Sequence, residues 1–351
     1  MKIEKSFVFK KMQDHSAEKF GKEKAAAIMQ YANTELQTLE ASEPDADKTS
    51  RLFVFPAVAL YRAVEHFAPG KALEVTRSYG TKIGVRMQKM KIHSFGEENK
   101  STIIMLPGSF CNADTMENII RKTETEFHVL AVDYNGQYED SKKAFTSRQG
   151  EAAEIVQYMK SHSIGAVALV YGQSMGAEIG MELIFQLEKT GIPVNAAFFD
   201  GGPFLKFPRF VSKILGNKFK TIIGNLRGKT LEEALKEPTI VKFSGGKPER
   251  YSGLLGPICQ NAEYISDETL EREADACVTF DFPQVKAALT FFYSKEESAY
   301  RFCHKKLEKA YPDSNMKLVS GYGHVGYPAE HLDEYCGWLK EAAIGKSHEA
   351  D

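Results

Sequence analysis

The pattern of hydrophobic and polar positions changes near residue 88, and the change predicts two kinds of structure. Before it, apolar residues recur at helical spacing, so helices are expected over 22–39, 53–66 and 72–90. After it, short apolar runs alternate with longer amphipathic stretches, as strands and helices do in turn. This alternation favours an α/β fold with a doubly wound, mostly parallel sheet. We therefore expect a helical N-terminal segment, residues 1–87, followed by an α/β domain, residues 88–351.

The expected strands of the α/β domain are 88–95, 101–106, 127–134, 167–171, 196–199, 287–293 and 316–319, with helices over 144–162 and 335–343. Residues 203–283 interrupt the alternation and are expected to form a helical cap insertion. Its first part, 204–229, carries seven basic residues, no acidic residue and an apolar face at helical spacing. An anionic substrate, an acyl carrier or a membrane surface would suit these charges. We favour a cap helix with a solvated basic face, because most charge runs are solvated.

The most informative stretch is 166–180, where an apolar run leads into Gly172-Gln-Ser-Met-Gly176 and then into an apolar helical face. A strand, a sharp turn and a helix form the context of a nucleophile elbow, which exposes the serine hydroxyl above the sheet. The motif predicts Ser174 as a nucleophile. It also places the Met175 N–H at a helix N-terminus, where that group can stabilise an oxyanion. Many Gly/Ser turns catalyse nothing, so an acid and a histidine must follow in the chain.

A histidine in a suitable setting follows near the C-terminus. Gly323-His324-Val-Gly326 comes soon after the last expected strand, and glycines on both sides suit a loop that brings an imidazole over the sheet edge. The other eight histidines lack this setting. We therefore predict His324 as the general base.

Residues from about 90 to 343 resemble the α/β-hydrolase superfamily. The resemblance lies in Gly172–Gly176, the Pro107-Gly108-Ser109 turn, the Asp133–Gly136 turn, the carboxylates near Glu297, and Gly323-His324. It implies a catalytic triad of nucleophile, acid and histidine in that order, with the backbone N–H of Ser109 as the second oxyanion donor. The chain departs from the usual pattern in having Pro107 where a histidine often stands, and in lacking recognisable first strands.

The resemblance leaves three carboxylates open as the triad acid. Aligning Ser294-Lys-Glu-Glu297 with the usual Gly-x-x-Asp turn gives Glu297, which ranks first. Asp200, at the end of the preceding strand, ranks second, and Glu296 ranks third. A serine hydrolase acting on a carboxylic ester, thioester or amide of a small-molecule acyl substrate is the expected function. The alternative is a non-catalytic scaffold of the same fold that binds a ligand or a partner.

Composition excludes several classes of function and location. The formal net charge of −2 gives no general attraction to nucleic acid. No apolar run is long enough for stable membrane insertion, and the N-terminus does not read as a secretory signal. The five cysteines form no C-x-x-C pair, so we expect reduced thiols, a cytoplasmic location, no metal and no cofactor.

The N-terminal segment carries no catalytic signature. Residues 53–90 resemble the helical family of L-2-amino-thiazoline-4-carboxylic acid hydrolase-like proteins, through a mostly apolar motif that implies no activity here. The helices are apolar enough to need a partner, and no flexible linker follows them. We expect them to dock on the hydrolase domain or to form a homo-oligomer with a second copy of the chain.

Overall fold

The computed structural model describes residues 5–42, 55–72, 75–76, 79, 90–139, 141 and 143–345. The chain divides into two compact units, Met1–Gln88 and Lys89–Asp351. Residues 43–54, most of the expected helix 72–90 and residues 346–351 lie outside the described residues.

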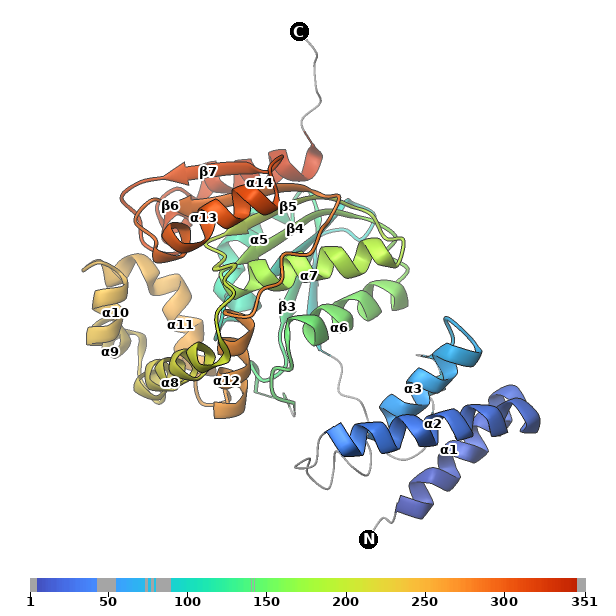
Figure 1. The fold of residues 1–351 in the computed structure, drawn as a ribbon. Helices are drawn as coiled ribbons and strands as arrows, with labels where there is room; N and C mark the ends of the chain where they lie inside the picture. Colours follow the sequence, from blue (N-terminus) through green and yellow to red (C-terminus); the bar gives the residue numbers. More distant parts are fainter. Residues whose placement is uncertain are drawn as a thin grey trace. The chain divides into compact units, whose positions relative to one another are not determined.

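The first unit contains helices α1 (Lys5–Phe20), α2 (Lys22–Ser42) and α3 (Phe55–Phe67) (Figure 1). They share a core of fully or almost fully buried apolar residues that includes Met12, Ile28, Leu36, Leu60 and Val64. The expected helices over 22–39 and 53–66 are present with shifted ends. Helix α1 was not anticipated, because its sequence places few apolar residues on one face. Of the described residues, no helix in either unit is long and apolar enough to cross a membrane.

The second unit is built on a seven-stranded sheet in the order β1-β3-β2-β4-β5-β6-β7. Its strands are β1 (Lys91–Phe95), β2 (Thr102–Leu106), β3 (His128–Asp133), β4 (Val167–Gln173), β5 (Val194–Asp200), β6 (Ala288–Ser294) and β7 (Asn315–Val319). Only β1 runs antiparallel, along β3 at one edge, and all other pairs are parallel. The predicted α/β class with a mostly parallel sheet is confirmed.

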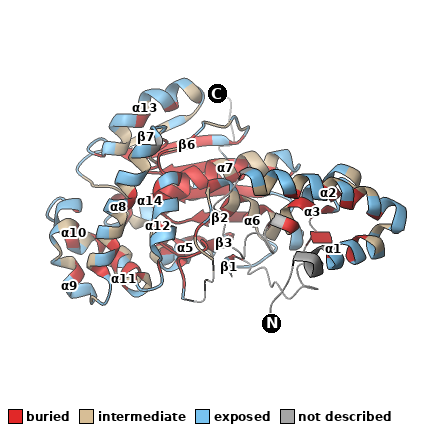
Figure 2. Cartoon of the chain, turned by 60° about the horizontal axis from the view of Figure 1, so that its bottom comes forward, coloured by how far each residue is buried: buried red, intermediate tan, exposed pale blue. Residues whose placement is uncertain are grey.

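The central strands form where apolar runs of the sequence are buried inside the unit. Every residue of β2, β3 and β4 is buried, because these apolar runs are covered on both faces of the sheet. Helices α6 (Arg148–Ser161), α7 (Met175–Lys189) and α13 (Ser298–Ala310) contribute to the core on one face, and α5 (Glu117–Thr123) and α14 (Leu332–Ile344) to the core on the other. Figure 2 shows the buried residues concentrated in the strands and in α7.

The expected helix over 144–162 is shorter than predicted. Ser147 caps α6 by accepting a hydrogen bond from the Gly150 N–H at 3.0 Å, so the helix starts at Arg148. Phe145 is fully buried and packs edge-on against Tyr134 instead. The apolar residue thus belongs to the core but not to the helix.

The insertion between β5 and β6 is a helical cap. It contains α8 (Arg209–Leu226), α9 (Leu231–Leu235), α10 (Pro238–Phe243), the 3₁₀ turn η3 (Pro248–Tyr251), α11 (Ser252–Asn261) and α12 (Asp267–Ala276), shown at the left of Figure 1. An antiparallel bridge between Lys206 and Thr279 joins its two ends. The cap has its own apolar core, which also takes in Cys111 from the loop after β2.

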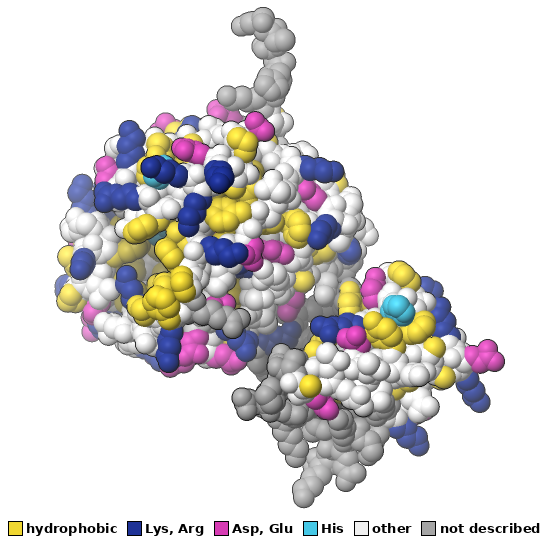
Figure 3. Space-filling view, in the orientation of Figure 1, with side chains coloured by type: hydrophobic (Ala, Val, Ile, Leu, Met, Phe, Trp, Pro, Cys, Tyr) yellow, Lys and Arg dark blue, Asp and Glu magenta, His cyan; other side chains and the backbone are white. Residues whose placement is uncertain are grey.

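Several of the basic residues at the start of the cap form ion pairs or hydrogen bonds within the protein. Lys220 pairs with Glu271 at 2.5 Å, Lys206 pairs with Asp281 at 2.7 Å, and Arg227 donates to the Ile265 carbonyl at 2.7 Å. Phe210 and Ile214 of α8 remain 66% and 63% exposed. Figure 3 shows Lys and Arg side chains spread among hydrophobic ones on the face drawn. These pairings agree with a packed cap helix that keeps part of its polar face in solvent.

Candidate active site

The sequence-predicted residues meet at the carboxyl edge of the sheet. Strands β2, β4, β5, β6 and β7 are consecutive parallel neighbours, so the loops that follow them lie side by side. The loop after β4 carries Ser174, the loop after β6 carries Glu297, and the loop after β7 carries His324. Residues more than 100 positions apart in the chain are brought to one edge in this way.

Ser174 stands on a strained turn between β4 and α7. Its φ of 52° and ψ of −121° lie outside the regions that residues with a side chain normally adopt. The turn is crowded, because a Cβ on Gly176 would lie 2.2 Å from the Leu106 carbonyl oxygen, and one on Gly172 would lie 2.4 Å from the Gly176 oxygen. Only glycine fits at both positions, as the nucleophile-elbow interpretation requires.

The loop after β2 faces Ser174. A Cβ on Gly108 would lie 3.2 Å from the Ser174 Cβ, so the backbone of this loop passes directly beside the serine. Within the described part of the chain, no acceptor takes the backbone N–H of Ser109 or of Met175, and Met175 is the first residue of α7. The Ser109 hydroxyl donates to the Met175 sulfur at 3.6 Å, which ties the two residues together. Both N–H groups are available to a ligand oxygen.

His324 bonds Glu297. The imidazole Nδ1 lies 2.7 Å from Glu297 Oε2, while Glu297 Oε1 accepts the Ser294 N–H at 2.7 Å. The Glu297 side chain is 3% exposed and that of His324 is 26% exposed. Burial acts to lower the pKa of His324, but the hydrogen bond and charge of Glu297, with the charge of Asp200, outweigh it and leave this pKa raised. A carboxylate that holds Nδ1 leaves Nε2 as the nitrogen free to exchange a proton.

Backbone contacts link Ser174 to His324. The Ser174 N–H donates to the Asp200 carbonyl at 2.8 Å, and the next residue, Gly201, lies under the imidazole. A Cβ on Gly201 would be 2.6 Å from the His324 Cε1. Ser174 and His324 therefore flank the same turn at the end of β5. The Gly201-Gly202 pair is the feature of the sequence that permits this close approach.

The two alternative acids are placed differently. Asp200 is fully buried and its Oδ2 accepts the Tyr335 hydroxyl proton at 2.7 Å. Burial and the charge of Glu297 raise the pKa of Asp200 to about 7. Glu296 is exposed and accepts the Ser294 hydroxyl proton at 2.5 Å. Of the three carboxylates, Glu297 is the one that contacts the His324 ring.

Aromatic side chains of the cap contact the loops that surround the candidate site. Phe219 of α8 packs edge-on against Phe110, whose ring centroid is 4.7 Å away, and Phe243 of α10 packs against His324 at 6.2 Å. The Phe110 N–H donates to Glu273 of α12 at 3.3 Å, so the loop after β2 is also held by the cap. Sequence reasoning missed these cap residues, because nothing local in their sequence marks them.

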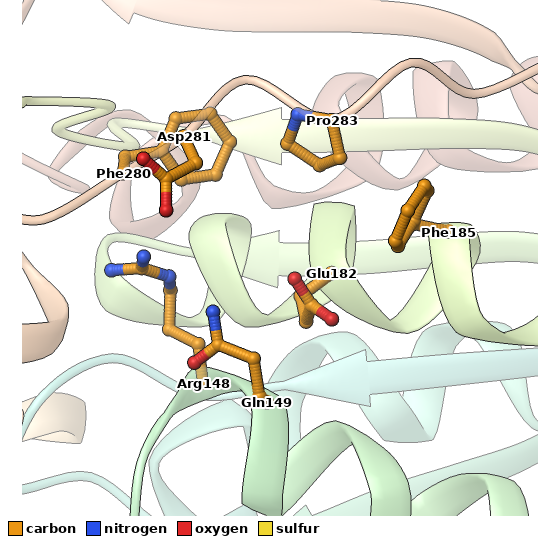
Figure 4. Close-up of a pocket in the computed structure, with 7 residues that line it drawn as sticks. All are labelled: Arg148, Gln149, Glu182, Phe185, Phe280, Asp281 and Pro283. Carbon is orange, nitrogen blue, oxygen red and sulfur yellow. The ribbon is translucent and has the colours of Figure 1, made fainter.

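A separate surface pocket lies between α6, α7 and residues 280–283, which follow the last cap helix (Figure 4). Its lining contains none of the candidate site residues. Arg148, one of its lining residues, donates to the Thr279 carbonyl at 2.6 Å and holds the end of the cap. In the described residues, no group of three or more His, Cys, Asp and Glu side chains could hold a metal ion.

Similarity to solved structures identifies the fold of the second unit. No protein-family model matches the sequence, and a search of curated proteins also found no match. Solved structures of alpha/beta hydrolases do match the second unit. The chain therefore has the α/β-hydrolase fold.

Particular structures are similar to it at low sequence identity. An enol-lactonase from Burkholderia xenovorans LB400 has a TM-score of 0.59 at 12% identity, over 73% of this chain and 96% of that one. An alpha/beta hydrolase enzyme from a Medee basin deep-sea metagenome library has a TM-score of 0.57 at 13% identity, over 73% and 94%. A marine microorganism esterase has a TM-score of 0.55 at 17% identity, over 72% and 98%. None of these findings supports the resemblance of residues 53–90 to the second, helical family.

Proposed function

We propose that this protein is a serine hydrolase that cleaves a carboxylic ester, or a related thioester or amide, through an acyl-enzyme. The hydrogen bond between His324 and Glu297, at the sheet edge that presents Ser174, carries the proposal. The esterase and the lactonase among the similar structures act on the same class of carbonyl, which agrees with it.

The first half-reaction forms the acyl-enzyme. Ser174 Oγ attacks the acyl carbon while His324 Nε2 accepts the hydroxyl proton. Glu297 keeps the imidazole in the required tautomer and stabilises its positive charge. The N–H groups of Ser109 and Met175 donate to the oxyanion of the tetrahedral intermediate. His324 then gives the proton to the departing oxygen, sulfur or nitrogen, and the bond to the leaving group breaks.

The second half-reaction restores the enzyme. A water molecule gives a proton to His324 Nε2 as its oxygen attacks the acyl carbon. The second tetrahedral intermediate collapses, the proton returns to Ser174 Oγ, and the carboxylic acid leaves.

A fluorophosphonate probe tests the proposal, because it phosphonylates a serine activated in this way. We expect labelling of the wild type and no labelling of Ser174→Ala, with the loss of about 10⁴–10⁶-fold in kcat. Ser163→Ala is the matched control, since Ser163 also has a positive φ (57°) but lies in the turn after α6. Labelling that survives in Ser174→Ala, or none in the wild type, would favour the non-catalytic scaffold. A panel of p-nitrophenyl and CoA esters of graded acyl length then defines the substrate.

A further inference from the structure

Tyr251 of the cap has a buried hydroxyl without a partner. The residue is 3% exposed, and within the described part of the chain no group donates to or accepts from its Oη. Burying a hydroxyl without a hydrogen bond costs on the order of 1–3 kcal/mol in proteins, so such groups are rare unless a ligand or water completes them.

The hydroxyl lies against the loop that carries His324. A Cβ on Gly323 would lie 2.6 Å from Tyr251 Oη, and one on Gly326 would lie 2.7 Å from it. The two glycines around His324, which we expect to suit a loop that brings the imidazole over the sheet edge, thus also make room for a phenol from the cap. Phe243 packs edge-on against both the Tyr251 ring, at 5.4 Å, and the His324 ring, at 6.2 Å.

The position of Tyr251 is fixed by its neighbour. Arg250 pairs with Glu330 at 2.6 Å, and its guanidinium lies 4.9 Å from the centre of the Tyr322 ring. Both partners belong to the segment around His324, so η3 of the cap is fastened to that segment. Burial raises the pKa of Tyr251 to about 12, against the effect of Arg250 and with smaller contributions from the charges of Glu297 and Asp200. The phenol is therefore neutral near pH 7 and available as a donor.

We propose that Tyr251 is a specificity-determining residue whose hydroxyl donates a hydrogen bond to an oxygen atom in the leaving group of the substrate. The inference rests on the proposed function. His324 delivers its proton to the leaving group, and Tyr251 packs against the loop that carries His324, so its hydroxyl would meet that half of the substrate. The substrate class is accordingly an ester whose alcohol half carries an ether, carbonyl or hydroxyl oxygen near the scissile bond.

Two esters of equal size separate this role from general packing. Butyl butanoate and 2-methoxyethyl butanoate differ only by an oxygen in place of a CH₂ in the alcohol half. Their alkaline hydrolysis rates give the intrinsic difference in reactivity. The enzymatic quantity is the ratio of kcat/KM for the ether-bearing ester to that for the butyl ester. In Tyr251→Phe we expect this ratio to fall by about 2–10-fold relative to wild type, the range of one neutral hydrogen bond.

Tyr264→Phe is the matched control, since Tyr264 is the other tyrosine of the cap and is 43% exposed. It should keep the wild-type ratio. Thermal unfolding checks that Tyr251→Phe folds. Because no internal hydrogen bond is lost, its Tm should equal or exceed that of wild type. A marked loss of Tm would show that the hydroxyl serves the fold, and would overturn the inference.

Three further outcomes decide the question. An equal ratio in wild type and Tyr251→Phe overturns the role of Tyr251 but leaves the proposed function standing. Equal slowing of both esters in Tyr251→Phe means that the residue positions the loop and does not read the leaving group, which also overturns it. A wild type that hydrolyses neither ester and is not labelled by a fluorophosphonate refutes the proposed function, and the leaving-group assignment with it.

Discussion

The Glu297 carboxylate lies 2.7 Å from the His324 Nδ1, whereas Asp200, which is also buried, accepts a hydrogen bond from the Tyr335 hydroxyl. Two carboxylates thus stand near one imidazole, and only one of them contacts it. Glu297 fixes the ring through both of its oxygens, one on His324 and the other on the Ser294 N–H. Asp200 acts on the ring only through its charge.

We expect Glu297→Gln to lower kcat by about 10³–10⁴-fold, because an amide cannot stabilise the imidazolium and favours the wrong tautomer. Steady-state kinetics on the best ester of the panel measures the effect. Glu296→Gln is the matched control, one residue away and exposed, and should stay within about threefold of wild type. Comparable losses in both variants would mean that the turn after β6, and not the Glu297 carboxylate, is what matters.

The pH profile should show the raised pKa of His324. The imidazole must be neutral to accept the serine proton, so kcat/KM falls as pH drops through its pKa. Because this pKa is raised, the acid limb should lie above pH 6.5, the ordinary value for histidine. Asp200, whose own pKa is raised to about 7, is partly ionised over this range. Asp200→Asn removes that share of negative charge, which favours the imidazolium, so it should move the limb to lower pH. A limb that is unmoved or shifts upward would contradict the electrostatic role of Asp200.

The local parts of this site were predictable from the sequence. The apolar run before Gly172, the G-x-S-x-G turn and the apolar face after it specify a strand, a strained turn and a helix within fifteen residues. The sequence does not separate Glu297, Asp200 and Glu296, because all three lie at the carboxyl ends of two neighbouring parallel strands, β5 and β6. What separates Asp200 is a hydrogen bond to Tyr335, 135 positions away, which no local pattern encodes.

The cap contacts could not be predicted for the same reason. Tyr251 and Phe243 occupy ordinary positions in short helical segments, and their roles follow from where the cap folds back over the sheet. The glycines around His324 are visible in the sequence. That they also leave room for the Tyr251 hydroxyl is visible only in the tertiary structure. Local patterns thus predict the candidate nucleophile and base, whereas the contacts that the cap makes with them depend on long-range packing.

Crowding at the elbow gives a stability prediction. Gly176→Ala would push a methyl group into the Leu106 and Pro107 carbonyl oxygens, 2.2 and 2.4 Å from the new Cβ. We expect a loss of about 1–3 kcal/mol or more in the free energy of unfolding, measured by urea denaturation. Gly337→Ala in α14 is the control, since its Cβ would meet nothing within 4 Å. It should gain about 0.5–1 kcal/mol from helix propensity. Equal effects of the two changes would argue against a close approach of the β2 loop to the elbow.

The N-terminal unit is expected to need a partner. Residues 1–88 form a small unit around one core, and a bundle of this size buries little surface. We therefore propose that it docks on the hydrolase unit or pairs with a second copy. Residues 88–351 expressed alone should show lower stability, altered kinetics or a smaller oligomer by light scattering. A monodisperse product with unchanged Tm, kinetics and oligomeric state would show that the unit is independent.

Glu178 gives a prediction for the pH dependence of stability. It lies in the first turn of α7 and is fully buried. Burial raises the pKa of its carboxyl to about 8, against the effects of Arg148 and of the Phe204 and Leu205 N–H groups. The folded protein therefore keeps this proton up to about pH 8, whereas the unfolded chain releases it near pH 4.5.

Stability from this group is fully present at low pH and is lost as pH rises between those values, by up to about 1.4 kcal/mol per pH unit. Glu178→Gln carries no proton to release, so its free energy of unfolding should fall less between pH 5 and pH 8 than that of wild type. Denaturation at both values measures this difference. Glu182→Gln, four residues or about one turn further along the same helix and partly exposed, reports the effect of the substitution itself. A wild type and a Glu178→Gln variant that lose stability in parallel would show that the carboxyl releases its proton equally in both states.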